Sequence, residues 1–233
     1  MTIDDFKQTT ENLLDNYLEL FREIEDISFI KPTRGAFKEV QQNILSQQSI
    51  AMLYAAWEGF FQNLLAEYIS FLNQEMIRAK VELFDLLDSI IVRHLEDQVS
   101  QLVNSPQKIT QKIRFYQKFE TTVTENPIKL NTIINTNSNL GFKVMNDRLI
   151  LFGIEKFSKV HEGLSGAQHF LERDLKSLLD SRNRIAHGAG SLTASKIDQK
   201  DYNDYKLLLG DLMAEIIERM LVALNNKTYL KSP

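Results

Sequence analysis

Hydrophobic residues recur at three-and-four spacing along most of this 233-residue chain, which is typical of amphipathic helices. The first such run extends from Ile3 to Ile24 and ends before a turn at Lys31 to Gly35. A second run, from Ile44 to Leu72, is hydrophobic around so much of its circumference that other parts of the protein must surround it. We expect this second helix to lie at the centre of the core.

Further helices are predicted in the segments Leu83 to Val103, Pro106 to Thr124, Lys143 to Phe152, Ile154 to His161, Ser165 to His187 and Asp201 to Leu224. Pro106 follows Ser105 as a proline follows an N-cap, and the glycines after His187 end the helix before them. Residues 126–141 are rich in Asn, Thr and Ser, which predicts a loop. No alternating pattern is long enough to build a sheet.

These elements predict an all-α bundle of about six to eight helices. We expect a single domain over residues 1–233, with an N-terminal helix and turn at 1–35 and a loop-rich insertion at 126–163.

Composition narrows the class of protein. The chain has no cysteine, which excludes disulfides and thiolate zinc sites and suits a reducing cytoplasm. The acidic start Met1 to Asp5 does not look like a signal peptide, and no stretch of about 18 apolar residues predicts a membrane span. The net charge of -4 argues against a protein that coats polyanions, although it permits a small, locally basic site.

One predicted helix has a basic and aromatic surface. Its side chains are Lys108, Lys112, Arg114 and Lys118, among Phe115, Tyr116 and Phe119. Such a mixture can contact RNA. Helical spacing also allows the aromatic rings to point inward while the lysines stay in solvent, and it favours this second interpretation.

The segment Ser181 to Gly188 (SRNRIAHG) gathers two guanidiniums, an amide and an imidazole. An imidazole transfers protons near neutral pH, and an arginine can hold a phosphodiester and neutralise the charge that develops as it is attacked. This chemistry makes Arg182 and His187 candidates for a ribonuclease site that needs no metal. Arg184 either contacts RNA or is an ordinary surface residue.

A helical wheel divides these candidates. Asn183 and His187, four residues apart, share one face, whereas Arg182 is displaced from His187 by roughly 140°. Arg182 and His187 thus need a partner surface or an unwound last turn to meet at one phosphate. A site at a homodimer interface satisfies this requirement.

With these residues, the chain resembles the HEPN superfamily, and in particular the cyanobacterial-type, RiboL-PSP-like HEPN ribonucleases. The signature of the superfamily is an arginine followed after four to six residues by a histidine, here Arg182 and His187, with Asn183 after the arginine. A second similar segment is Ala55 to Phe61 (AAWEGFF), about 125 residues earlier. The resemblance covers Ser46 to Leu224.

The resemblance implies a HEPN-like helical core and a metal-independent endoribonuclease that needs no cofactor. It also implies that Arg182, His187 and Asn183 are the catalytic residues, with Asn183 orienting the site. Such enzymes act as dimers on RNA, giving 2′,3′-cyclic phosphate ends. They serve as toxins or antiphage effectors, often beside an antitoxin or defence-system partner. In HEPN toxins controlled by adenylylation a tyrosine stands two positions after the histidine, where this chain has Ala189, so such control is not implied.

Several alternatives stay open. Glu58 either supports the site by pairing with Arg182 or His187, or is a buried carboxylate satisfied by a structural arginine. Trp57 is either a core residue or a base-stacking platform, and we favour the core. The remaining histidines show no metal-ligand spacing. A non-catalytic HEPN-type module that binds RNA or nucleotides, or a scaffold whose Arg/His cluster stabilises a dimer, are the alternative functions.

Overall fold

The computed structural model describes residues 1–29, 39–103, 108–124, 127–136, 139–187 and 197–232. The predicted turn at Lys31 to Gly35, the Ser105-Pro106 start and Gly188 to Gly190 lie outside these residues. Within them, the elements are α1 (Ile3–Phe29), α2 (Glu39–Ala79), the short 3-10 helix η1 (Leu83–Asp85), α3 (Asp88–Val103), α4 (Ile109–Thr124), α5 (Phe142–Leu151), β1 (Val160–Glu162), β2 (Gln168–Phe170), α6 (Leu171–Ala186) and α7 (Gln199–Asn225). The prediction of an all-α bundle is confirmed.

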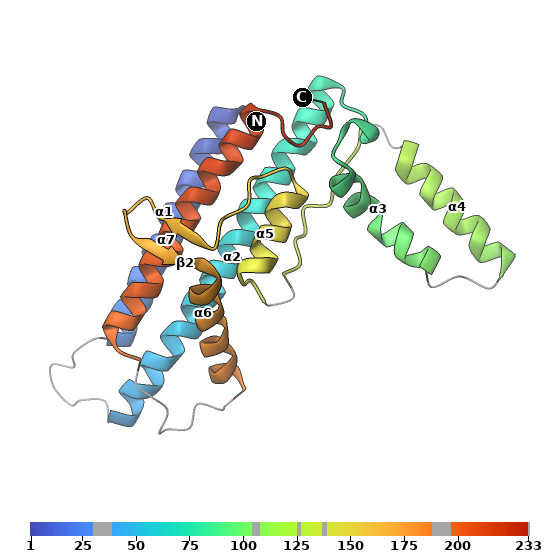
Figure 1. Cartoon of the computed structure of the whole chain (residues 1–233). Coiled ribbons are helices and arrows are strands. Elements are labelled where there is room, and N and C mark those ends of the chain that lie inside the picture. Colours follow the sequence, from blue (N-terminus) through green and yellow to red (C-terminus); the bar gives the residue numbers. More distant parts are fainter. Residues whose placement is uncertain (30–38, 104–107, 125–126, 137–138, 188–196, 233) are drawn as a thin grey trace.

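Three long helices form the body of the protein. α1 packs against α2 and α7, and α6 packs against α2 and α5 (Figure 1). α2 has 41 residues, a length of about 60 Å. As its hydrophobic pattern predicts, α2 supplies much of the buried core: Trp57, Phe60, Phe61, Leu64 and Leu65 are fully buried. The indole N–H of Trp57 donates to the Leu140 carbonyl at 3.4 Å, so Trp57 belongs to the core.

The predicted loop contains neither helix nor strand over residues 127–136 and 139–141, which we call the strap. It is nevertheless packed, because Ile128, Leu130, Ile134 and Leu140 are buried. The Asn73 side chain accepts from the Leu130 N–H at 2.7 Å and donates to its carbonyl at 3.0 Å. α2 thus satisfies both backbone polar groups of Leu130, which have no secondary-structure partner.

Two predicted helices are wrong in extent or kind. The segment Leu83 to Val103 is divided at Leu86, whose extended backbone pairs with Leu230 near the C-terminus. The segment Ile154 to His161 is not helical. The Asn146 side chain holds both the N–H and the carbonyl of Phe157, at 2.8 and 3.2 Å. The first difference arises from a contact with a residue near the other end of the chain and the second from a side chain on the preceding helix, and the hydrophobic pattern reveals neither.

A small antiparallel hairpin precedes α6, so the helix predicted from Ser165 begins instead at Leu171. Strands β1 and β2 pair His161 with His169. Asp211 of α7 holds the hairpin by accepting from the Ser165 N–H at 3.0 Å, from the Ser165 hydroxyl at 2.6 Å and from His169 Nε2 at 2.8 Å. We call Ser165, His169 and Asp211 the hairpin clasp. It determines where α6 starts.

Candidate functional site

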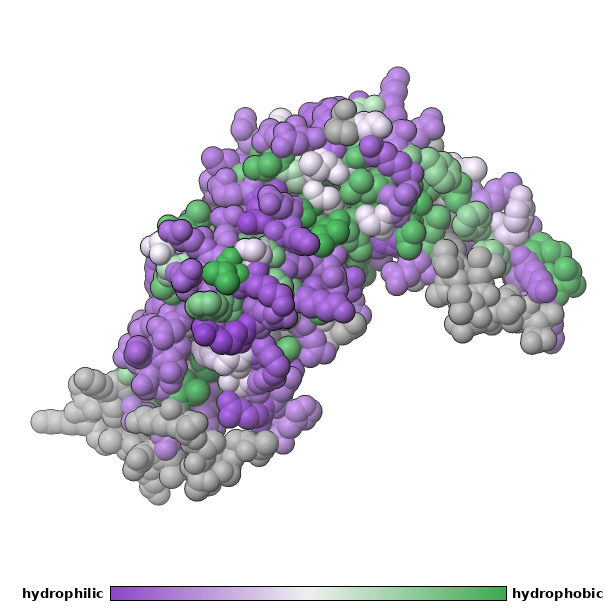
Figure 2. Space-filling view, viewed as in Figure 1, coloured by the Kyte–Doolittle hydropathy of each residue, from purple (hydrophilic) through white to green (hydrophobic). Residues whose placement is uncertain are grey.

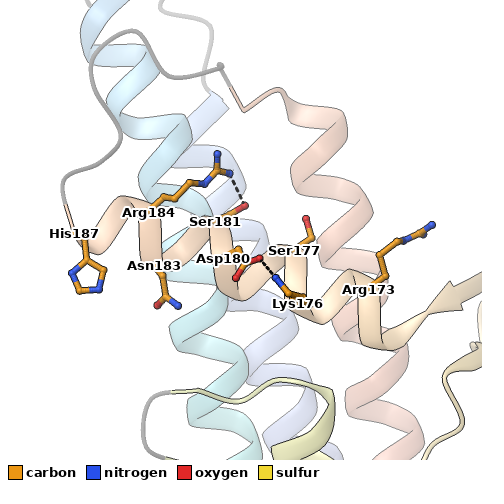
Figure 3. Close-up of a pocket in the computed structure, with 8 residues that line it drawn as sticks. All are labelled: Arg173, Lys176, Ser177, Asp180, Ser181, Asn183, Arg184 and His187. Carbon is orange, nitrogen blue, oxygen red and sulfur yellow. Dashed lines mark hydrogen bonds and ion pairs between the residues drawn. The ribbon is translucent and has the colours of Figure 1, made fainter.

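The predicted site residues lie at the C-terminal end of α6. The helix buries Leu171, Leu175, Leu178 and Ser181 and exposes a polar face. That face carries an open groove of about 780 Å³, lined by Arg173, Lys176, Ser177, Asp180, Ser181, Asn183, Arg184 and His187 (Figure 3). The three-and-four spacing that buries one side of α6 therefore gathers Asn183, Arg184 and His187, but not Arg182, on the polar face.

His187 is the residue that ends α6. Its backbone N–H donates to the carbonyls of Asn183 and Ile185, while its side chain is exposed. The imidazole makes no hydrogen bond to another described residue. Asn183 and His187 project from the same side of α6 (Figure 3), as the helical wheel predicts. The His187 ring nitrogens are thus available to a ligand in the groove.

Arg182 is half-buried on a different flank of α6 and does not line the groove. Its guanidinium donates to Asn183 Oδ1 at 2.9 Å. The guanidinium carbon also lies 5.2 Å from the centre of the Tyr54 ring on α2, within reach of a cation–π contact. Asn183 therefore shares the groove with His187 and a hydrogen bond with Arg182.

Tyr54 forms the surface on which Arg182 rests. It is buried, and its hydroxyl accepts from the Leu140 N–H at 2.6 Å. Burial, with a smaller contribution from the Glu58 charge, raises the pKa of Tyr54 to about 12 against the opposing effects of the Leu140 hydrogen bond and Arg182. The phenol consequently stays neutral at physiological pH, and its ring supports the cation without forming an ion pair.

Glu58 lies near this cluster but binds elsewhere. Its carboxylate accepts from the Thr136 hydroxyl of the strap, and the Gln62 amide donates to the same hydroxyl oxygen at 2.8 Å. Within the described residues, Glu58 forms no ion pair with Arg182 or with His187. Glu58 thus acts directly on the strap, and its supporting role at the motif remains a prediction.

The charge of the groove is mainly positive. Arg184 is exposed and donates to the Ser181 hydroxyl at 3.2 Å (Figure 3). Lys176 pairs with Asp180 within the groove, and Arg173 pairs with Asp174 beside it at 2.8 Å. Three permanent cations thus line a groove with one carboxylate, before His187 is counted. Such a surface favours anionic ligands such as phosphates.

Sequence reasoning missed Tyr54 and the groove residues Arg173, Lys176, Ser177 and Asp180. The groove residues carried a signal, because they precede Asn183 and His187 at helical spacing on one polar face. Tyr54 stands four residues before Glu58 on α2, but the chain pattern does not reveal that Arg182 packs on it.

Neither a metal site nor a membrane span is found in the described ranges. No group of three His, Asp or Glu residues there is arranged to hold a metal ion. Every helix there is too short or too polar to traverse a lipid bilayer.

Comparison with known proteins identifies the family. The model of the RiboL-PSP-HEPN family matches residues 15–221, which include α6, most of α1 and α7, and all of α2. No curated protein and no solved structure matches the chain. Membership points to RNA cleavage or RNA binding as the broad role. With its helical bundle and the matched span, the chain belongs to the RiboL-PSP-HEPN family of the HEPN superfamily.

Proposed function

We propose that this protein is a metal-independent endoribonuclease. The observation that carries the proposal is the position of Asn183, which lines a cationic groove with the exposed His187 imidazole and accepts from the Arg182 guanidinium. Family membership supports the choice of RNA as the ligand. A proton-transfer group beside a phosphate-binding surface is what cleavage by a ribose hydroxyl requires.

In the proposed reaction the ribose 2′-OH attacks the adjacent phosphorus and the 5′-oxygen leaves. The products are a 2′,3′-cyclic phosphate and a 5′-hydroxyl. His187 removes the proton from the 2′-OH or supplies one to the leaving oxygen. Arg182 stabilises the additional negative charge of the phosphorane, and Asn183 orients the guanidinium. Arg184 holds a neighbouring phosphate. DNA lacks the 2′-OH and should not be cleaved.

The active form in this proposal is a homodimer. Arg182 and His187 leave α6 on different flanks, and only His187 lines the groove. Two copies related by a two-fold axis bring the Arg182 of one beside the His187 of the other. The site is then composite, and each monomer alone is incomplete.

The biological role we propose is that of a cytoplasmic toxin or antiphage effector restrained by a partner protein. Unrestrained cleavage of cellular RNA would stop growth. Expression of the wild-type chain should therefore be toxic, and Arg182→Ala or His187→Ala should each relieve the toxicity.

The decisive experiment incubates purified protein with RNA in EDTA and identifies the ends of the products. We expect cleavage with cyclic phosphate ends and no cleavage when the scissile 2′-OH is replaced by hydrogen. His187→Ala should abolish cleavage, whereas Glu172→Gln, an exposed change on α6 outside the groove, should not. Equal cleavage by the His187→Ala protein would overturn the assignment.

One observation favours the alternative of a non-catalytic RNA- or nucleotide-binding module. Arg182 already has partners in Asn183 and Tyr54, as a structural arginine would. Such a module binds RNA with the same affinity before and after His187→Ala and leaves every RNA intact.

A further inference from the structure

Among the helices and strands that the structure describes, α4 packs mainly against α3. α3 and α4 project from the body as an arm (Figure 1), and α4 packs against α3 with none of its own residues buried. Three hydrophobic side chains on one flank remain exposed: Ile109 by 69%, Ile113 by 50% and Tyr116 by 61%. Figure 2 shows hydrophobic atoms at the free end of this arm.

The arm also carries a local positive charge. Residues 108–124 contain four cationic side chains, all exposed, and one carboxylate, which gives this segment a charge of +3. The whole chain has a charge of -4, so the remainder carries -7. A cationic segment on an acidic protein attracts polyanions to itself and not to the body.

The aromatic residues of α4 divide into two groups. Phe115 and Phe119 stack on each other at 6.0 Å between ring centres and are half-buried, and Phe119 packs against the core. Tyr116 points into solvent instead. The sequence-based interpretation of inward aromatic rings is thus right for the two phenylalanines and wrong for Tyr116. An exposed ring among lysines is the arrangement on which unpaired bases stack.

We propose that α4 is a second RNA-contacting surface, which binds single-stranded RNA extending beyond the α6 groove. This inference rests on the proposed function in one respect, which is that the α6 groove also binds RNA. Lysine is depleted from the cores of protein interfaces, yet Lys112 borders the exposed hydrophobic flank one turn before Tyr116, and Lys108 stands one turn before Lys112. The helix is about 24 Å long, enough to contact several nucleotides. The preferred substrate is therefore an RNA with a long unpaired segment.

The test measures RNA binding in a His187→Ala background, so that the RNA stays intact. The arm variant carries Lys112→Gln, Arg114→Gln and Lys118→Gln. The matched control, Lys7→Gln, Arg22→Gln and Lys156→Gln, removes the same three charges from exposed positions elsewhere. Glutamine retains helix propensity, so α4 should persist in both variants.

For a single-stranded RNA of about 30 nucleotides, the arm variant should bind about tenfold more weakly than the control, and the slope of log affinity against log salt should fall by about 2. Tyr116→Ala should weaken binding by roughly tenfold with little change in that slope. If the arm variant and the control bind equally, the proposal is wrong.

Cleavage separates this proposal from the proposed function. With His187 intact, an RNA of about five nucleotides, long enough only for the groove, should be cut equally well by the arm variant and the control. If the arm variant and the control variant cleave long RNA at the same rate, α4 makes no second contact with RNA and the proposal is wrong. If the protein binds RNA through α4 but cleaves no RNA, this inference stands and the proposed ribonuclease activity is wrong. If Ile109→Ser with Ile113→Ser converts dimers to monomers while the arm variant binds RNA normally, α4 is a protein interface and the proposal falls.

Discussion

The hairpin clasp and the α6 groove each contain a histidine, but the two histidines are engaged very differently. His169 is buried and its Nε2 lies 2.8 Å from Asp211, which also accepts two hydrogen bonds from Ser165. His187 is exposed and has no side-chain partner within the described ranges. The first imidazole is committed to holding β1, β2 and α7 together. The second is available to a ligand, so chemistry and stability should respond to different substitutions.

The largest expected effect sharpens this contrast directly. His187→Ala should lower RNA cleavage by about 10²- to 10⁴-fold, because the proton-transfer group is lost. Its melting temperature should not change, since the side chain makes no contact that the fold needs. His169→Ala should show the reverse behaviour, with a lower melting temperature and cleavage retained at low temperature. Parallel cleavage assays and thermal denaturation measure both effects, and a stable, inactive His169→Ala protein would contradict the division.

Arg182→Ala should have the next largest effect and lower RNA cleavage by about 10²- to 10³-fold, because the group that stabilises the phosphorane is lost. Arg182→Lys keeps the charge but not the planar group that lies over Tyr54 and donates to Asn183. It should recover only part of the activity. Mixing Arg182→Ala with His187→Ala protein should restore some cleavage, because each copy supplies what the other lacks at one of two composite sites. No recovery on mixing would count against the dimeric site.

Asp211→Asn probes the structural side of the comparison. The substitution removes the charge that receives His169 and Ser165 and should cost about 2 kcal/mol of unfolding free energy. Burial alone would raise the pKa of Asp211. The hydrogen bonds from His169 and Ser165, together with the His169 charge, outweigh burial, so the pKa of Asp211 lies below its ordinary value. The carboxylate therefore contributes stability above its unfolded pKa of about 4 and loses it as the pH falls through the lower folded value.

Urea denaturation from neutral to acidic pH measures this contribution. The difference in stability between the wild type and Asp211→Asn should shrink as the solution becomes acidic. A difference that stays constant across that range would show that the Asp211 charge does not stabilise the clasp.

The smallest effect concerns Tyr54. Tyr54→Leu removes the ring beneath Arg182 and should lower kcat by roughly 3- to 30-fold with KM nearly unchanged, since the guanidinium is misplaced for the transition state. Tyr54→Phe keeps the ring and loses only the bond from Leu140, so it should retain most of the activity. If the phenylalanine variant loses as much as the leucine variant, the hydroxyl and not the ring positions Arg182.

Much of this arrangement was predictable from local patterns. The hydrophobic run from Ile44 to Leu72 predicted the central helix, and the spacing of Asn183 and His187 predicted their common face. The errors occurred where distant residues decide the backbone, as where Leu230 pairs with Leu86 and Asp211 holds Ser165. The contact between Arg182 and Tyr54 escaped prediction for the same reason, because it joins two helices whose relative placement only the assembled core determines.

The bond from Arg182 to Asn183 also gives the groove a polarity. The amide oxygen of Asn183 accepts from the guanidinium, which fixes the orientation of the amide and leaves its nitrogen to donate to a ligand. A phosphate oxygen would satisfy that nitrogen. Asn183→Asp should keep the bond from Arg182, because a carboxylate also accepts, but it replaces the donor with a negative charge, so we expect it to weaken the binding of anions in the groove.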